Sequence, residues 1–192
     1  MKITVYNYKG GTGKTRISLN LALTMNFSVI TNDVYSPVDS VLDKKSFLKL
    51  KIDQKMPKLP KDADVIFDFG GYPDERAITA LKESNYVLIP VLLDFGDLQV
   101  TLDFINEIKK YNKNIIIIAN RTKKGGLNQI KKAVGKFFPN FPVFEIKESK
   151  AMTNLFNEKK SIYDMVQEGG IKKYHFQVLA DQFQEIIDYM NK

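Results

Sequence analysis

A segment near the N-terminus combines glycine, lysine and threonine in an order suited to binding phosphate. Residues 7–15 read Asn-Tyr-Lys-Gly-Gly-Thr-Gly-Lys-Thr. Glycine lets the backbone adopt conformations, and approach a ligand to distances, that a Cβ atom forbids. Backbone N–H groups at a helix N-terminus attract anions. We therefore expect Lys14 to reach the β- and γ-phosphates of a nucleotide, and the Thr15 hydroxyl to bind Mg²⁺.

The flanking segments fit that role. Residues 1–6 alternate apolar side chains and predict a buried strand, whereas residues 16–25 carry apolar side chains at helical spacing. A strand, a glycine-rich turn and a helix in this order place the N–H groups of the turn at a helix N-terminus. The alternative interpretation is an ordinary glycine-rich turn with two solvated lysines.

One position departs from the standard phosphate-binding loop. The pattern G-x-x-x-x-G-K-[ST] needs a glycine five residues before Gly13, and this chain has Tyr8 there. A second lysine, Lys9, precedes the glycine pair. This K-G-G-x-G-K-T form resembles the deviant Walker A motif of the ParA/MinD family of ATPases. The resemblance implies that the nucleotide is ATP and that Lys9 reaches the partner's phosphates in a nucleotide sandwich dimer. The loop residues expected to bind nucleotide are Lys9, Gly10, Gly11, Thr12, Gly13, Lys14, Thr15 and Arg16.

Acidic residues follow or end two further predicted strands, at residues 27–31 and 64–68. Ligands of open α/β sheets bind at the carboxyl ends of the strands. Asp68 ends an apolar run typical of a core parallel strand, and we expect it to hold Mg²⁺, usually through water. Asp33 is expected near the phosphates, where it supports the metal and the attacking water.

The segment after Asp33 leaves the water-orienting residue open. In the ParA family this strand usually ends in an Asp-x-Asp-Pro-Gln type of sequence that opens switch I. If Asp33 matches the first aspartate, Tyr35 stands in place of the second, which orients water in relatives; this puts hydrolysis in doubt. In a shifted register, Asp33 itself has that role. Asp39 is a weaker candidate, or else the N-cap of a short helix at residues 40–42.

Two further sites follow from the resemblance. Gly70 and Gly71 follow Asp68 as in the D-x-G-G switch II of ParA proteins, which implies that their backbone moves and offers an N–H to the γ-phosphate. Asn120 follows a strongly β-branched run, and in the family an asparagine at this strand end binds the adenine edge. The alternative for Asn120 is a turn-forming asparagine.

The remaining patterns predict a three-layer α/β domain over residues 1–192, of the P-loop NTPase type, with a mostly parallel sheet flanked by helices. Further strands are expected at 86–90, 114–119 and 141–146, and an edge strand at 48–52. Helices are expected at 74–84, 97–110, 150–158 and 172–191. The last helix could target a membrane, but acidic residues dominate its polar face and favour core packing.

Composition narrows the function. The chain has no cysteine and one histidine, which excludes disulfides, thiolate metal sites, iron–sulfur clusters and histidine metal clusters. No apolar run is long enough for a membrane span, the chain starts directly with a strand rather than a signal peptide, and a cytoplasmic location is expected.

Residues 109–173 hold 15 Lys and Arg against 5 Asp and Glu, a net +10, while the remainder carries −3. This asymmetry indicates either a surface for a polyanion, with nucleic acid first and an anionic membrane second, or an ordinary solvated lysine face. The residues proposed for DNA are Arg121, Lys123, Lys124, Lys131, Lys132 and Lys150.

The resemblance implies a ParA-like partitioning ATPase. Such a protein dimerises around ATP and Mg²⁺, binds DNA non-specifically on the nucleoid, and is released by hydrolysis that a ParB-like centromere-binding partner stimulates. Basal hydrolysis is expected to be weak, with Lys9, Lys14 and Asp33 as the catalytic residues. The alternatives are a MinD-like positioning ATPase on a membrane, a nucleotide-binding switch with impaired hydrolysis, and an ATP-dependent ligase on the same fold.

Overall fold

A seven-stranded parallel sheet forms the centre of the molecule. The computed structural model describes residues 1–71 and 74–192, with only the backbone at positions 95 and 97. The strands are β1 (Lys2–Val5), β2 (Ser28–Thr31), β3 (Phe47–Lys49), β4 (Val65–Asp68), β5 (Tyr86–Val91), β6 (Ile115–Thr122) and β7 (Val143–Lys147). Their order in the sheet is β3-β2-β4-β1-β5-β6-β7, and every pairing is parallel. The prediction of a mostly parallel sheet flanked by helices is confirmed.

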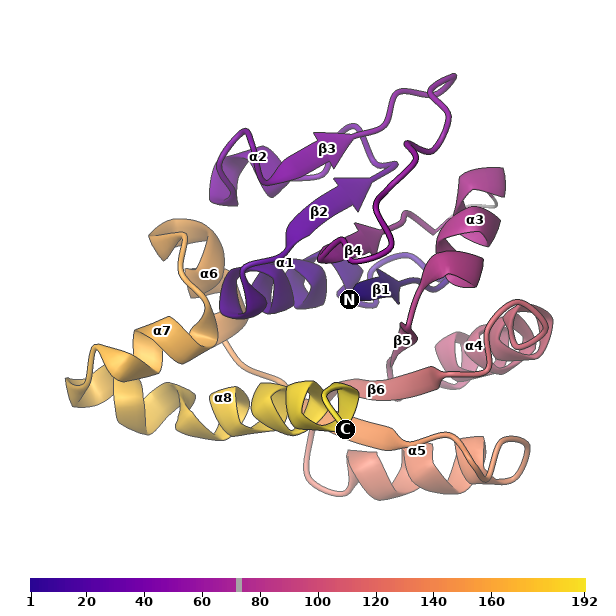
Figure 1. The fold of residues 1–192 in the computed structure, drawn as a ribbon. Helices are drawn as coiled ribbons and strands as arrows, with labels where there is room; N and C mark the ends of the chain where they lie inside the picture. The colour runs from indigo at the N-terminus through magenta and orange to yellow at the C-terminus, as the bar shows by residue number, and fades with distance from the viewer. Residues whose placement is uncertain (72–73) are drawn as a thin grey trace.

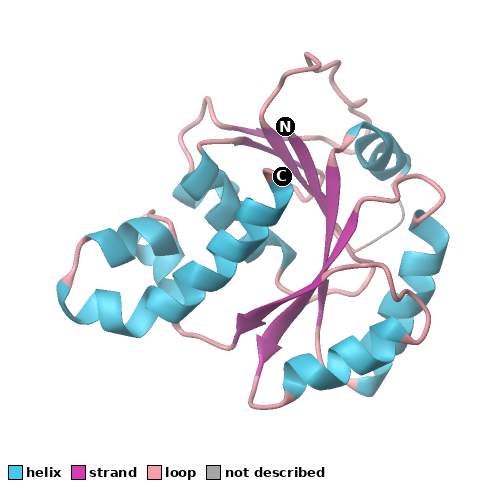
Figure 2. Ribbon diagram, turned by 60° about the horizontal axis from the view of Figure 1, so that its bottom comes forward, coloured by secondary structure: helices cyan, strands magenta, loops and turns pink. Residues whose placement is uncertain are grey.

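Helices cover both faces of the sheet (Figures 1 and 2). They are α1 (Lys14–Met25), α2 (Val38–Val41), α3 (Glu75–Glu83), α4 (Phe95–Ile108), α5 (Gly126–Gly135), α6 (Ala151–Glu158), α7 (Ile162–Gln167) and α8 (Gly170–Met190). One face packs against α1, α2, α6, α7 and α8, and the other against α3, α4 and α5. This gives the expected three layers.

The core is divided by the sheet, because side chains of successive strand residues point to opposite faces. In β6, Ile116 and Ile118 belong to the cluster under α1 and α8, and Ile115 and Ile117 to the cluster under α4 and α5. Both faces of β6 are therefore buried, which explains why its sequence is a continuous β-branched run rather than an alternating one. The rigid centre of the sheet fixes the strand ends that carry the candidate site.

The C-terminal helix contributes to this core. Leu179, Phe183, Ile186 and Met190 of α8 are almost fully buried. Core packing of the apolar face, rather than its exposure to a membrane, is confirmed for this part of the helix. No helix in the described ranges, 1–71 and 74–192, has the length and apolar character needed to cross a membrane.

Among the local predictions that differ from the structure, three concern β6, β3 and α2. Strand β6 continues to Thr122, past the expected end at residue 119, so Asn120 lies within the strand. The edge strand β3 covers residues 47–49 instead of 48–52, since the chain turns away after Leu50, and Ile52 is 86% exposed. The short helix α2 begins after Pro37, so Asp39 lies in its first turn instead of capping it. The Asp39 carboxylate pairs with Lys49 Nζ at 2.8 Å, a contact across two elements that local sequence does not reveal.

Candidate functional site

The glycine-rich segment connects β1 to α1 at the carboxyl edge of the sheet and borders a cavity of about 580 Å³. Helix α1 begins at Lys14, two residues earlier than expected, so the loop N–H groups sit directly at its N-terminus. The cavity brings together residues from the loop and from the ends of β2 and β4. The predicted site residues that line it are Gly10, Gly11, Gly13, Lys14, Thr15, Arg16, Asp33, Asp68, Gly70 and Gly71, and Arg121 joins them.

The turn itself requires glycine at position 13. Gly13 has φ 92°, in the left-handed region that side chains disfavour. A Cβ atom there would also lie 2.4 Å from Asn120 Nδ2. Asn120 in turn donates a hydrogen bond from Nδ2 to the Thr12 carbonyl at 2.7 Å. The end of β6 therefore holds the glycine-rich loop in place through the hydrogen bond from Asn120.

The two lysines of the loop have different surroundings. The Lys14 side chain is buried, and its ammonium donates a hydrogen bond to the Lys9 carbonyl at 3.0 Å. Burial lowers the pKa of Lys14, and the negative charges of Asp68 and Asp33 oppose that shift. Lys9 lies at the surface, with its N–H bonded to Asn7 Oδ1 at 2.9 Å. The fold thus aims Lys14 at the cavity and leaves Lys9 on the outer side of the loop.

Asp68 is the most deeply buried acid of the site. It is 2% exposed, and burial raises its pKa to about 6, although hydrogen bonds from Thr15 and Ser18 counteract the shift. The Ser18 hydroxyl lies 3.0 Å from Asp68 Oδ1. The sequence analysis assigned no role to Ser18. The pattern that could have revealed it is a hydroxyl on the buried side of α1, one turn after Lys14. Thr15 and Ser18 orient a carboxylate that faces the phosphate loop.

The three residues considered for orienting water on the loop after β2 differ in exposure and in their position relative to the cavity. Asp33 lines the cavity, and its charge acts on both Lys14 and Asp68. Tyr35 is 92% exposed, and Asp39 is an exposed partner of Lys49. Of these three side chains, the Asp33 carboxylate is the one placed to act on a ligand beside Lys14.

A second cavity, of about 450 Å³, adjoins the first. It is lined by Asn120, by residues 147–150 after β7 and by the start of α6, and it shares Gly13, Arg16 and Arg121 with the first cavity. A ligand with phosphates in one cavity and an aromatic ring in the other would pass beside these three shared residues. Asn120 lines the second cavity next to the glycine-rich loop, and its role toward a base stays a prediction.

Arg121 has a position that the sequence did not suggest. Its guanidinium donates a hydrogen bond to the Gly11 carbonyl, and its backbone has φ 51° at an irregularity in the pairing of β6 with β7. Lys150 also lines the second cavity. Of the six residues proposed for DNA, these two line the two cavities. Lys123 and Lys124 precede α5 and Lys131 and Lys132 lie on it, all four exposed, and Lys123 Nζ is 3.6 Å from a Glu148 carboxylate oxygen.

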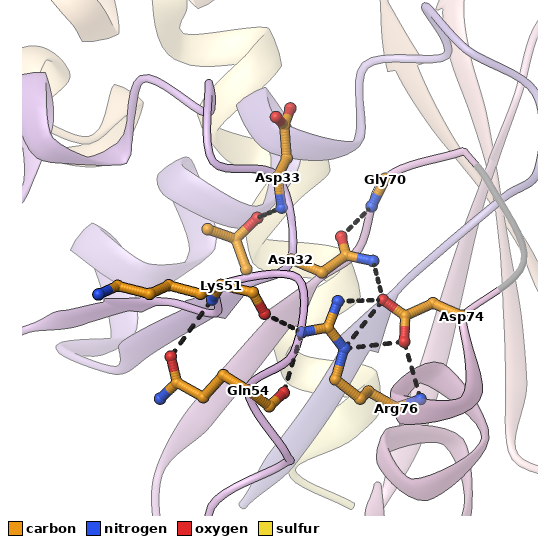
Figure 3. A network of polar contacts seen from close by, with 8 residues as sticks. Asn32, Asp33, Lys51, Gln54, Gly70, Asp74 and Arg76 are labelled. Carbon is orange, nitrogen blue, oxygen red and sulfur yellow. Dashed lines mark hydrogen bonds and ion pairs between the residues drawn. The ribbon is translucent and has the colours of Figure 1, made fainter.

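A polar network connects the segment after β4 to two other elements (Figure 3). Gly70 N–H donates to Asn32 Oδ1 at 2.7 Å, and Asn32 Nδ2 donates to Asp74 Oδ2 at 2.7 Å. Asp74 caps α3 and also accepts hydrogen bonds from the Arg76 side chain. The sequence analysis assigned no role to Asn32, Asp74 or Arg76. Asn32 follows β2, whereas Asp74 and Arg76 lie at the start of α3, and only the fold brings these two elements together.

Comparison with known proteins identifies the fold. No protein-family model matches the sequence, and a search of curated proteins also finds no match. Solved structures do match over nearly the whole chain. A variant of Cyanothece McdA in complex with ATP has a TM-score of 0.70 at 12% sequence identity, covering 100% of this chain and 96% of that one.

Two other solved structures show the same arrangement. The septum site-determining protein MinD of Pyrococcus horikoshii, complexed with Mg-ADP, has a TM-score of 0.66 at 13% identity and covers 98% of this chain and 97% of its own. A putative plasmid partition protein of Borrelia burgdorferi, bound to AMPPNP, has a TM-score of 0.56 at 15% identity, with 96% and 97% covered. The fold is that of the ParA- and MinD-type ATPases.

Proposed function

We propose that this chain, which has the fold of the ParA- and MinD-type ATPases, binds ATP with Mg²⁺ and hydrolyses it as a nucleotide-dependent positioning switch. The observation that carries the proposal is the convergence of Lys14, Thr15, Asp33 and Asp68 on one cavity at a helix N-terminus. Two similar structures contain nucleotides, Mg-ADP in one and AMPPNP in another, which supports a nucleotide as the ligand.

The donor set suits the proposed metal. A hydroxyl from Thr15 and carboxylates from Asp68 and Asp33 are hard oxygen ligands, and Mg²⁺ prefers such ligands together with water and phosphate oxygens. Bound there, Mg²⁺ would neutralise charge that develops on the phosphates. Lys14 would bind the β- and γ-phosphates, and Asn120 the base. Asp33 borders the cavity beside Lys14, and we therefore assign it the role of orienting the attacking water. This assignment favours a protein that hydrolyses ATP over a switch that binds ATP without hydrolysing it.

The finer form of the proposal is DNA partitioning by a dimer. In it, ATP closes two copies through Lys9, the lysines around α5 bind DNA without sequence preference, and a ParB-like partner stimulates release. The positive excess of residues 109–173 and the exposure of Lys123, Lys124, Lys131 and Lys132 support DNA over a membrane. Burial of the apolar face of α8 favours the same choice.

The direct test is nucleotide binding by the Lys14→Ala variant. Removing the ammonium takes a charge-assisted contact from the phosphates, so we expect affinity for AMPPNP in Mg²⁺ to fall by at least about 10-fold, roughly 1.4 kcal/mol. Titration calorimetry with wild type and variant measures this, and phosphate release measures hydrolysis.

The matched control is Lys61→Ala, which removes an exposed lysine from the loop before β4. It should bind AMPPNP as the wild type does. Equal affinity of Lys14→Ala and wild type, or no binding of ATP or ADP by the wild type, would overturn the proposed function.

A further inference from the structure

Gly70 has its N–H bonded on the side away from the phosphate cavity. Gly70 itself lines that cavity, yet the acceptor of its N–H is Asn32 Oδ1 at 2.7 Å, and Asn32 does not line the cavity. Asn32 is 3% exposed, so water does not readily replace it as acceptor. A phosphate in the cavity can use the Gly70 N–H only after this hydrogen bond has broken and the peptide has turned.

Asn32 is held in place from its other side. Its Nδ2 donates to Asp74 Oδ2, and this carboxylate also accepts from Arg76 Nη2, both at 2.7 Å. The side chains of Asp74 and Arg76 are only 6% and 14% exposed. Because Nδ2 can only donate and Oδ1 can only accept, Asp74 fixes which atom of the amide faces Gly70.

The same arginine reaches the loop that follows β3. Arg76 Nη1 donates to the carbonyl oxygens of Lys51 at 2.7 Å and Gln54 at 3.0 Å. Figure 3 shows the continuous series from Gly70 through Asn32 and Asp74 to this loop. Three segments, at residue 32, at residues 51–54 and at residues 70 and 74–76, therefore share one set of hydrogen bonds, and a movement of Gly70 removes the bond that joins it to Asn32.

We propose that Asn32, positioned by Asp74 and Arg76, is a latch that retains the Gly70 N–H until a γ-phosphate displaces it, and so sets how strongly the site prefers ATP to ADP. This inference rests on the proposed function, because it assumes nucleotide at the cavity. ADP lacks the γ-phosphate and leaves the latch closed. ATP binding must exchange the hydrogen bond between Gly70 N–H and Asn32 Oδ1 for one to the γ-phosphate.

The test compares AMPPNP with ADP in wild type and Asn32→Ala. Without the latch, AMPPNP no longer has to break the Gly70–Asn32 bond, so its affinity should rise by about 3- to 10-fold, the range that the net contribution of one hydrogen bond allows. Affinity for ADP should stay unchanged. A variant that only damages the site would weaken both ligands equally, so the ratio of the two dissociation constants identifies the latch.

Two other variants complete the comparison. Arg76→Lys keeps the positive charge but loses the fork that clamps Asp74, and we expect a smaller shift of the ratio in the same direction. Asn114→Ala removes a comparable amide, which donates to the Asn85 carbonyl at 3.0 Å at the opposite edge of the sheet, and should leave the ratio unchanged.

Hydrogen exchange of the Gly70 amide, followed by NMR in nucleotide-free protein, provides a measurement that needs no ligand. Exchange should be at least about 10-fold faster in Asn32→Ala than in wild type, because the N–H loses its buried acceptor. Unchanged exchange, or an unchanged ratio of AMPPNP to ADP affinity in a variant that still binds both, overturns the latch alone. Failure of the wild type to bind either nucleotide overturns the proposed function and the role of the latch with it.

Discussion

At the scale of the residue, the buried carboxylate of Asp68 shows a conflict between stability and chemistry. Burial raises its pKa to about 6, which means that folding makes the ionised carboxylate less favourable than it is in water. A metal ligand must be ionised, so the fold keeps a charge at neutral pH that its surroundings disfavour. Hydrogen bonds from Thr15 and Ser18 reduce that cost without removing it.

Asp68→Asn should therefore stabilise the metal-free protein at neutral pH. The pKa rises from 3.8 to about 6 on folding, so the folded state binds the proton more tightly, and the free energy of unfolding falls as pH rises through this window. The variant removes this dependence and should gain up to about 3 kcal/mol at pH 7. Urea unfolding at pH 7 and pH 4 measures the gain, which should shrink at the lower pH.

The same substitution should abolish the effect of Mg²⁺ on nucleotide binding, since it removes the anionic oxygen. Calorimetry with AMPPNP in Mg²⁺ and in EDTA checks this. A variant less stable than wild type at neutral pH, or one that retains the full Mg²⁺ effect, would contradict this account of Asp68.

At the scale of the element, parallel pairing assembles the site. Val5 of β1 and Thr31 of β2 both pair with Asp68 of β4, so the three strands end level with one another. The loops that follow them then emerge at one edge, as the geometry of open α/β sheets requires. The segment after β4 passes so close to the phosphate loop that a Cβ atom on Gly71 would lie 2.5 Å from the Tyr8 carbonyl oxygen.

Gly71→Ala should therefore push the segment at residues 69–71 away from the phosphate loop. Backbone on both sides of the contact cannot yield as a flexible side chain does, and we expect a loss of about 1–3 kcal/mol in stability. Affinity for AMPPNP should fall by at least about 10-fold, because Gly70 and Gly71 line the cavity. Thermal unfolding and calorimetry measure the two effects.

Gly135→Ala is the control, since a Cβ atom at the end of α5 meets nothing within 4 Å. It should bind nucleotide normally and match or exceed the stability of the wild type. If Gly71→Ala behaves in the same way, the close approach of the two loops does not constrain the site.

At the scale of the whole molecule, the glycine-rich loop and the exposed lysines proposed for DNA lie on different elements. Lys9 lies on the outer side of the loop, whereas the exposed lysines follow β6 onto α5. Joining two copies would double the number of lysines that DNA meets, and each phosphate neutralised adds about 0.9 to the log–log slope of affinity against salt. The proposed switch thus needs a dimer to become a strong DNA binder.

Lys9→Ala should leave ATP binding nearly unchanged and prevent dimerisation. The hydrogen bond that Lys14 donates to residue 9 is accepted by the backbone carbonyl, which the substitution preserves. With AMPPNP and Mg²⁺, light scattering should report a monomer for the variant and a dimer for wild type, and DNA shift assays should show binding by wild type only.

Lys61→Ala again serves as the control and should behave as the wild type in both assays. A Lys9→Ala variant that dimerises and binds DNA normally would reject a role for Lys9 across the dimer. DNA binding by the wild type without nucleotide would instead contradict the coupling of ATP to DNA.

The sequence alone determined most of the strands and helices and the reactive residues of the loops between them. The glycine-rich loop, Lys14, Asp33 and Asp68 follow from local patterns, because strand and helix periodicity and turn residues act over short stretches of chain. The tertiary structure alone decided which distant groups meet. Ser18 meets Asp68, Arg121 reaches Gly11, and Asn32 holds Gly70 through contacts that span from 38 to 110 positions. Strand order and register create these contacts, and no local pattern carries that information.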